Sequence, residues 1–134
     1  MQKLPAHAQS SSTLNGAINV GFTSNPCVST KLLKNVAINV AAAATLLLVP
    51  SSGNAKIYVC KLLVIEGGTT NVTLITGTGT LCGSNTTQLT GPIPLSWFES
   101  GGSIPNYITP AGYQFCLINS AAVQVSGSLE YVQQ

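Results

Sequence analysis

Apolar and polar residues alternate through much of the chain after its first 35 residues. Val36, Ile38 and Val40 occupy every second position, so they share one face of an extended strand. A second apolar run, 45–49, is followed by Pro-Ser-Ser-Gly-Asn at 50–54, a composition typical of a turn. The pattern therefore predicts two consecutive strands in this part of the chain.

Residues 56–65 form the strongest predicted strand, and they are apolar on both faces. Such a strand is typical of a position that is buried on two sides. We expect one face to lie in the core and the other at a contact between subunits. The face predicted for the subunit contact comprises Ile57, Val59, Leu63 and Ile65. A Gly67-Gly68 turn follows, and residues 71–76 are predicted to return beside this strand as its hairpin partner.

The rest of the chain continues in short apolar segments between clusters of glycine, proline and serine. Residues 93–98 are expected at the periphery of a sheet, because Pro92 and Pro94 cannot donate ladder hydrogen bonds. Residues 113–118 and 123–132 are predicted to close the chain as strands. Short strands about ten residues apart are typical of an antiparallel sandwich, and their number fits an eight-stranded jelly roll.

The first 30 residues contain serine, glycine and proline without a sustained period. We interpret 1–30 as an extended N-terminal arm with one short strand around 17–22, either ordered by a neighbour or frayed. The predicted fold is all-β: an antiparallel, jelly-roll-like β-sandwich of residues 31–134 after this arm. We expect no secretory leader and no membrane anchor, because the longest apolar run falls well short of the ~20 residues that a membrane helix needs.

Charged side chains are scarce, and this changes the expected function. The 134 residues include no Arg and no Asp, one His, three Glu and five Lys, while Ser, Thr, Asn and Gln make up about a third of the chain. An enzyme usually brings acids, bases or metal ligands together, so we expect no catalytic, cofactor or metal site. A net charge of +2 without a basic cluster also argues against nucleic-acid binding.

His7 lies in the predicted arm, with no acid or cysteine near it, and is interpreted as a solvated residue. Glu66, Glu99 and Glu130 are scattered along the chain. A glycosidase needs two carboxylates at a controlled separation, and scattered glutamates make this activity a disfavoured alternative.

Aromatic residues provide the one candidate ligand site. Trp97, Tyr107 and Tyr113 lie near glycine-rich loops, where exposed rings could stack on sugars. The alternative is that these rings pack in the core, and this alternative is favoured. The glycine-rich segment 77–83 is interpreted as a loop with positive φ angles, because a phosphate cradle needs a following helix and usually a Lys.

Four cysteines, at Cys27, Cys60, Cys82 and Cys116, contain no CxxC pair and have no histidine near them, so a zinc site is not expected. They allow two disulfides in three connectivities, or four buried thiols. We favour disulfides, because Cys27 and Cys82 lie in loop-like surroundings where a covalent link stabilises most.

A series of short motifs over residues 27–132 resembles a family of small structural proteins of tailed bacteriophages. The motifs are Ile57-Tyr58-Val59-Cys60, Gly77-Thr78-Gly79-Thr80 with Cys82-Gly83, Leu89-Thr90-Gly91, Pro110-Ala111-Gly112, Cys116-Leu117 and the segment 119–127. The resemblance is to capsid decoration (cement) proteins and to fibre modules. It implies a jelly-roll-like fold, trimeric assembly, no catalytic residues, and a disulfide framework of the four cysteines formed outside the cell.

The leading hypothesis from sequence is therefore a non-enzymatic virion structural protein on the capsid surface. Its expected partners are copies of itself, as a trimer, and the major capsid protein or other virion proteins, without nucleic acid or membrane. A glycan- or receptor-binding fibre module that uses the three aromatic residues is the first alternative. A secreted cell-surface adhesin or filament subunit is the second.

Overall fold

A computed structural model describes residues 25–28, 32–94, 97–102 and 104–134. Most of the predicted arm, including His7 and the strand expected around 17–22, lies outside the described residues. The first described element is a short 3-10 turn, η1 (Pro26–Val28), which lies within the range predicted for the arm.

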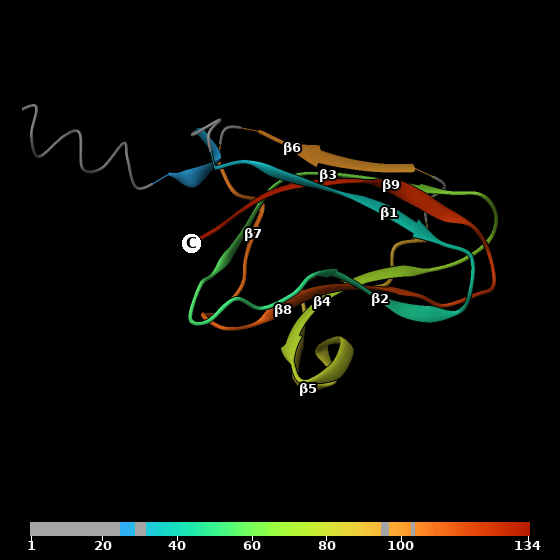
Figure 1. The fold of residues 1–134 in the computed structure, drawn as a ribbon. Coiled ribbons are helices and arrows are strands. Elements are labelled where there is room, and N and C mark those ends of the chain that lie inside the picture. Colours follow the sequence, from blue (N-terminus) through green and yellow to red (C-terminus); the bar gives the residue numbers. More distant parts are fainter. Residues whose placement is uncertain (1–24, 29–31, 95–96, 103) are drawn as a thin grey trace, which may run out of the picture.

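The described residues form nine strands in two antiparallel sheets that pack face to face (Figure 1). The strands are β1 (Lys34–Val40), β2 (Ala44–Val49), β3 (Ile57–Glu66), β4 (Val72–Thr78), β5 (Ser84–Gln88), β6 (Trp97–Gly101), β7 (Tyr107–Ile108), β8 (Gln114–Asn119) and β9 (Val125–Gln133). A second 3-10 turn, η2 (Thr80–Cys82), precedes β5. Sheet A has the order β1-β9-β3-β6, with β7 paired to β3, and sheet B has the order β2-β8-β4-β5.

The strand pairing is that of a jelly roll. Strands β1, β2, β3 and β4 pair with β9, β8, β6 and β5 respectively, so the chain behaves as one long hairpin rolled into two sheets. Pairing of β3 with β9 and of β4 with β8 then closes the two sheets. Eight strands in this arrangement make a jelly roll, with β7 as an addition. The predicted all-β, jelly-roll-like sandwich is confirmed.

The core fills the space between the two sheets. Its fully buried side chains include Ile57, Val59, Leu62 and Val64 of β3, Leu129 of β9, and Phe115 and Leu117 of β8. In β1, the alternation predicted from sequence is confirmed, since Val36, Ile38 and Val40 face this core. Apolar burial on this scale is the main stabilising contribution to such a sandwich.

A buried polar cluster joins the loops at one end of the sandwich. The Thr70 hydroxyl donates a hydrogen bond to Asn119 Oδ1 at 2.6 Å and accepts one from the Ala121 N–H at 3.1 Å. The Asn119 amide donates to the carbonyls of Ala42 at 3.0 Å and Val123 at 2.8 Å. These hydrogen bonds hold three loops together. A buried polar network stabilises a fold most when every polar atom in it has a hydrogen-bond partner.

A β-bulge in β3 changes which residues of that strand share a face, so the prediction for the subunit contact needs correction. The pairing of β3 with β9 shifts register between Val59 and Lys61, so the alternation changes phase at Cys60. Ile57 and Val59 lie fully buried in the core, whereas Leu63 and Ile65 face outward. The four residues predicted for one subunit contact therefore do not share a face, and only the last two can meet a partner.

The predicted hairpin across Gly67-Gly68 is wrong. Strand β3 belongs to sheet A and β4 to sheet B, so this segment crosses between the sheets. The Gly67 N–H donates to the Gln124 carbonyl at 2.8 Å, and a Cβ on Gly68 would lie 3.2 Å from Val123. The two glycines let the crossing pass close to the β8–β9 connection, which explains the local composition.

Two smaller corrections concern the edges of the sheets. The predicted strand 93–98 is an isolated bridge between Ile93 and Val72, followed by β6 at the edge of sheet A. The glycine-rich segment 77–83 contains η2, where Leu81 and Cys82 have φ angles of 52° and 58°. The positive φ angles expected there are present, although two of them belong to residues other than glycine.

All four cysteines form disulfides, as the sequence favoured. Cys27 is bonded to Cys60, and Cys82 is bonded to Cys116. The two bonds attach the two 3-10 turns to the two sheets, η1 to β3 of sheet A and η2 to β8 of sheet B.

Candidate functional site

Within the described part of the chain, every charged side chain that lies in a strand belongs to sheet A. Lys34 is in β1, Lys61 and Glu66 are in β3, Glu99 is in β6 and Glu130 is in β9. The strands of sheet B contain Ser, Thr, Asn and Gln but no charged residue. Of the two sheets, only sheet A can therefore contact a ligand through charged side chains of its strands.

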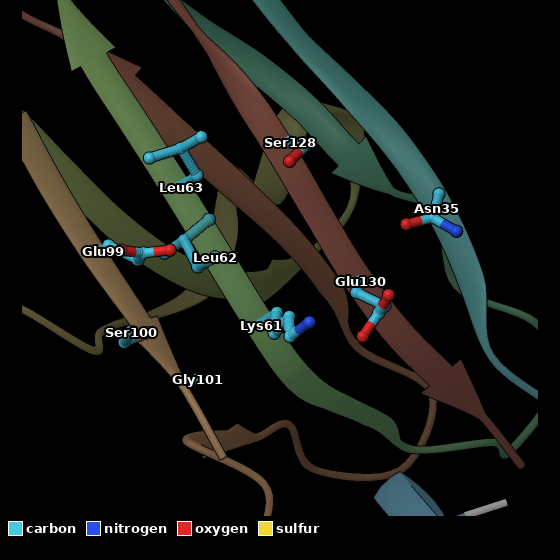
Figure 2. Close-up of a pocket in the computed structure, with 9 residues that line it drawn as sticks. All are labelled: Asn35, Lys61, Leu62, Leu63, Glu99, Ser100, Gly101, Ser128 and Glu130. Atoms are coloured by element: carbon cyan, nitrogen blue, oxygen red, sulfur yellow. The ribbon is translucent and has the colours of Figure 1, made fainter. Parts of the chain in front are cut away.

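Three of these charges gather in one groove on the outer face of sheet A (Figure 2). The groove encloses a volume of about 530 Å³ and is partly open to solvent. Its lining residues come from all four long strands of the sheet: Asn35, Lys61, Leu62, Leu63, Glu99, Ser100, Gly101, Ser128 and Glu130.

The register of the strands explains this gathering. Lys61 stands directly opposite Glu130 of β9, and on the other side of β3 Leu63 stands opposite Glu99 of β6. Directly opposed residues of antiparallel strands share a face of the sheet. In Figure 2 the Lys61 side chain points toward Glu130, while Glu99 lies across β3 from them. Ser128, a small residue opposite Leu63, leaves the middle of the groove hollow.

The polar side chains of the groove have no partner within the described part of the chain. Lys61, Glu99 and Glu130 make no hydrogen bond there and no ion pair within 4.0 Å, and the Asn35 amide and Ser128 hydroxyl are likewise unpartnered. Their hydrogen-bonding capacity is directed to solvent or to a ligand. The groove thus combines acceptor-only carboxylates, a donor-only ammonium group and an amide that does both.

Burial changes two ionisable groups outside the groove. Glu66 is 6% exposed and its Oε2 atom has no hydrogen-bond partner, and burial raises the pKa of this carboxyl above its usual value. Burial also raises the pKa of the Tyr107 hydroxyl. Neither residue lines the groove, so neither shift concerns ligand binding there.

The three aromatic residues predicted as a stacking site are not brought together. The backbone of Trp97 is paired with Ile65 near the end of β3, whereas Tyr107 is paired with Val59 near its beginning. Six residues of strand separate these positions, about 20 Å at the usual rise per residue. Tyr107 packs against the core cluster, and Tyr113 is half-buried after the turn that ends at Gly112. One joint stacking platform is therefore not formed.

Four exposed apolar residues lie on segments near the Cys27–Cys60 disulfide, and together they are called the apolar patch. They are Val28, Leu32, Ile104 and Ile108, which are 58%, 48%, 67% and 50% exposed. Val28 follows Cys27, Ile108 pairs with Tyr58, and the Asn106 amide donates to the Cys60 carbonyl at 3.2 Å. Figure 1 shows η1, the approach to β7 and the start of β1 at this same end.

This apolar patch was missed at the level of sequence. Its members come from two stretches that are far apart in the sequence, 28–32 and 104–108, and neither stretch is a periodic apolar run, so no local pattern indicates that they lie at the same end of the sandwich. The cysteine at position 27 was the nearest signal, since a disulfide to β3 fixes where η1 lies. Exposed apolar residues that gather at one end of a sheet are candidates for an interaction site.

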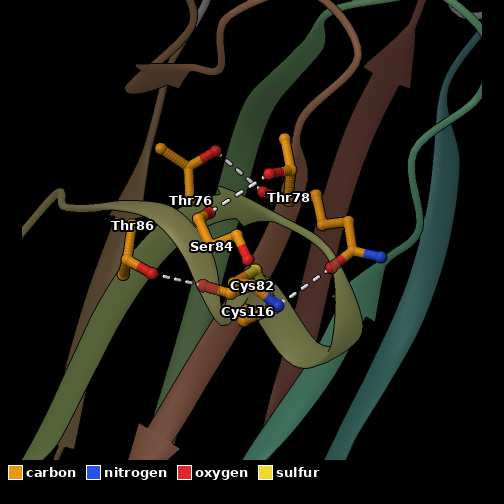
Figure 3. Close-up of a disulfide and its surroundings, with 7 residues drawn as sticks. Thr76, Thr78, Cys82, Ser84, Thr86 and Cys116 are labelled. Carbon is orange, nitrogen blue, oxygen red and sulfur yellow. Dashed lines mark hydrogen bonds between the residues drawn. A yellow bond between two sulfur atoms is a disulfide. The ribbon is translucent and has the colours of Figure 1, made fainter.

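The outer face of sheet B, by contrast, is partly covered by its own chain (Figure 3). The buried Cys82–Cys116 disulfide and Ile75 form a second small core, with Leu47 and Ile118 packed against it. The Cys82 N–H donates to Gln114 Oε1 at 2.9 Å, and the Thr86 hydroxyl donates to the Cys82 carbonyl. These bonds hold η2 on the sheet.

Within the described ranges, no group of three or more His, Cys, Asp or Glu side chains is placed to hold a metal ion. In the same ranges, no helix has the length and apolar character to cross a membrane. The groove and the apolar patch, both on sheet A, are therefore the features of the described residues that call for a functional explanation.

The chain is a jelly-roll β-sandwich with two disulfides inside the chain, and its sheet A carries both the groove and the apolar patch. Comparison with protein-family models, with curated proteins and with solved structures found no match.

Proposed function

We propose that the protein is a non-enzymatic virion structural protein, a capsid decoration protein that assembles as a homo-oligomer, a trimer, on the surface of a phage head. Its partners in this proposal are other copies of itself and the major capsid protein. The motif resemblance over residues 27–132 supports this proposal, and a jelly roll suits it because viral capsid domains often use this fold. The same fold also occurs in unrelated functions, so the argument depends on the surface.

The observation that carries the proposal is the apolar patch of Val28, Leu32, Ile104 and Ile108. Burying the exposed half of such side chains against a second copy contributes about 1 kcal/mol each, from the usual value for full burial. Lys34, two residues after Leu32, and Lys61, next to Cys60, lie on this part of sheet A, so a contact here has to leave their ammonium groups at its solvated edge. Exposed apolar side chains on a surface with so few charges are suited to packing against copies of the same chain.

The anchored start of the sandwich gives this patch a second role in the proposal. The Cys27–Cys60 disulfide holds η1 on sheet A, so Asn25, where the described chain begins, lies at the same end of the sandwich as the patch. A subunit contact at the patch would bring the Asn25 ends of neighbouring copies close together. In the proposal the residues before Asn25 contact the capsid.

The direct test is quantitative mass spectrometry of density-gradient-purified particles from the source of the sequence. A decoration protein is expected to co-sediment with the major capsid protein in a fixed proportion close to that of the capsid subunits. A few copies per particle would indicate a fibre or tail component. Absence from particles would overturn the virion proposal and favour a cell-surface role.

The subunit contact has its own test in the substitution Ile104→Lys. Ile104 is the most exposed large apolar residue of the patch, so a lysine there should leave the fold intact and weaken assembly. Leu81→Lys is the matched control, because Leu81 is also exposed, at 42%, but lies in η2 on sheet B. Light scattering coupled to size exclusion should show smaller species for Ile104→Lys alone. If the assemblies of the two variants have the same mass, the patch is not part of the subunit contact.

A further inference from the structure

We propose that the groove on the outer face of sheet A is a carbohydrate-binding site, which takes a short oligosaccharide with no net charge. This inference goes beyond the structural role and does not depend on it, since the groove lies in a single copy of the chain. The juxtaposition that carries it is Lys61 between Glu99 and Glu130, with Asn35 and Ser128 beside them, over the side chain of Leu63.

The size and rigidity of the groove suit a small ligand. Its volume of about 530 Å³ falls within the usual range for small-molecule sites. All of its lining residues lie on strands of one continuously hydrogen-bonded sheet. A site built on strands is held more precisely than one built on loops, so a ligand would find its partners already in place.

The chemistry of the groove matches hydroxyl groups better than it matches an ion. A hydroxyl donates one hydrogen bond and accepts others, so it can donate to a glutamate and accept from the Lys61 ammonium group. Bonds to ionised partners are about twice as strong as neutral ones. Lys61 offsets one of the two carboxylates, so the attraction for a bare cation is reduced. Asn35 adds an amide that can pair with two neighbouring hydroxyls of one sugar ring.

The same groups make the groove an unfavourable subunit contact. Burying two carboxylates and an ammonium group under a partner costs several kcal/mol per ion unless each is paired with good geometry. A hydroxylated ligand can offer each of these groups a hydrogen bond and leave the groove partly open to water. The apolar patch beside the Cys27–Cys60 disulfide, which contains no charged side chain, suits a protein partner better.

An apolar floor completes the site. Leu63 is half-buried in the groove, and Ile65, two residues further along β3, is 43% exposed on the same face. Sugar rings present C–H groups that can pack on such side chains.

The test uses the purified full-length protein, without particles. An array of hexose, hexosamine and deoxyhexose oligosaccharides identifies the tightest glycan, and calorimetry then measures its affinity for Lys61→Gln and Glu130→Gln. Each variant should bind at least about tenfold more weakly, because each removes a charge-assisted hydrogen bond. Lys56→Gln is the matched control, since it removes the same charge from an exposed lysine outside the groove, and it should bind like the wild type.

Three results would overturn the assignment. The first is an array on which the wild-type protein retains no glycan. The second is unchanged affinity in both groove variants, which would move the site elsewhere. The third is a change in oligomer mass caused by Lys61→Gln or Glu130→Gln, which would make the groove a subunit contact. Particle association is measured separately, so failure of the virion proposal and failure of the glycan site are distinguishable.

Discussion

Sheet A and sheet B belong to one sandwich, yet their outer faces are built differently. Sheet B has no charged residue in its strands, and η2 folds back over its outer face to form a second small core. Sheet A carries all the charged residues found in strands, and its outer face holds an open groove. From this contrast we propose that the outer face of sheet B mainly stabilises the molecule, while the outer face of sheet A is available for recognition.

The two disulfides make this contrast measurable, because the chain segments that they close are almost equal. Cys27–Cys60 spans 33 residues and Cys82–Cys116 spans 34. A model based on chain entropy gives both bonds the same stabilisation, about 4 kcal/mol. Any difference between them must therefore come from the folded surroundings. Cys82 and Cys116 are both fully buried, whereas Cys27 is half-buried at the start of the described chain.

The largest expected effect is the loss of the disulfide on sheet B. Cys82→Ala with Cys116→Ala should lower the free energy of unfolding by about 4 kcal/mol or more, because cavity formation adds to the loss of chain constraint. Cys27→Ala with Cys60→Ala should cost about 1 kcal/mol less. Urea denaturation of both double variants under oxidising conditions measures the difference. Equal losses, or a larger loss on sheet A, would contradict the proposed division between the sheets.

A close backbone approach under the groove is the next most sensitive point. A Cβ on Gly127 of β9 would lie 1.9 Å from the Leu63 carbonyl oxygen of β3. Gly127→Ala should therefore push the two strands apart and cost about 2 to 3 kcal/mol, in the range of other overpacking substitutions. Gly91→Ala is the control, since its Cβ would meet no atom within 4 Å. Thermal unfolding of the two variants should separate them; similar midpoints would show that sheet A tolerates the added methyl group.

The smallest expected effect concerns Glu66, the charged residue of sheet A that is buried. Because burial raises its pKa in the folded state above 4.5, the folded protein holds this proton more tightly than the unfolded chain. Stability should therefore decrease as the pH rises from about 4.5 through the raised pKa of the folded state, and remain lower above it. Glu66→Gln should unfold at a higher temperature than wild type at pH 7, and the gap should narrow toward pH 4. An equal or wider gap at pH 4 would show that Glu66 is not destabilised by burial.

The strands of the core were largely readable in the sequence. Alternation placed Val36, Ile38 and Val40 on one face, and turn residues placed the end of β2, because these signals depend on neighbours along the chain. The bulge at Cys60 was not readable, since a change of phase in a strand that is apolar on both sides leaves no trace in hydrophobicity. The crossing at Gly67-Gly68 was likewise mistaken for a hairpin, because glycine pairs suit both.

The candidate site was readable only in parts. The scarcity of charge drew attention to Glu99 and Glu130 as individual residues, but they are 31 positions apart and the sequence reading left them scattered. Their approach to Lys61 follows from β3 lying between β6 and β9, a long-range pairing. Strand pairing also explains why Trp97, Tyr107 and Tyr113 do not form one joint site. They are near one another in the sequence, but Trp97 and Tyr107 pair with opposite ends of β3.

The sequence by itself determined the all-β class, the positions of most strands and the near absence of charge, because these depend on composition and on contacts between near neighbours. It favoured disulfides over free thiols without deciding between them. The tertiary structure alone decided the disulfide pairing, the phase of β3, the apolar patch and the groove. Each of these arises where strands far apart in the chain become neighbours in a sheet. That choice of neighbours is made by the packing of the whole core, which no local pattern specifies.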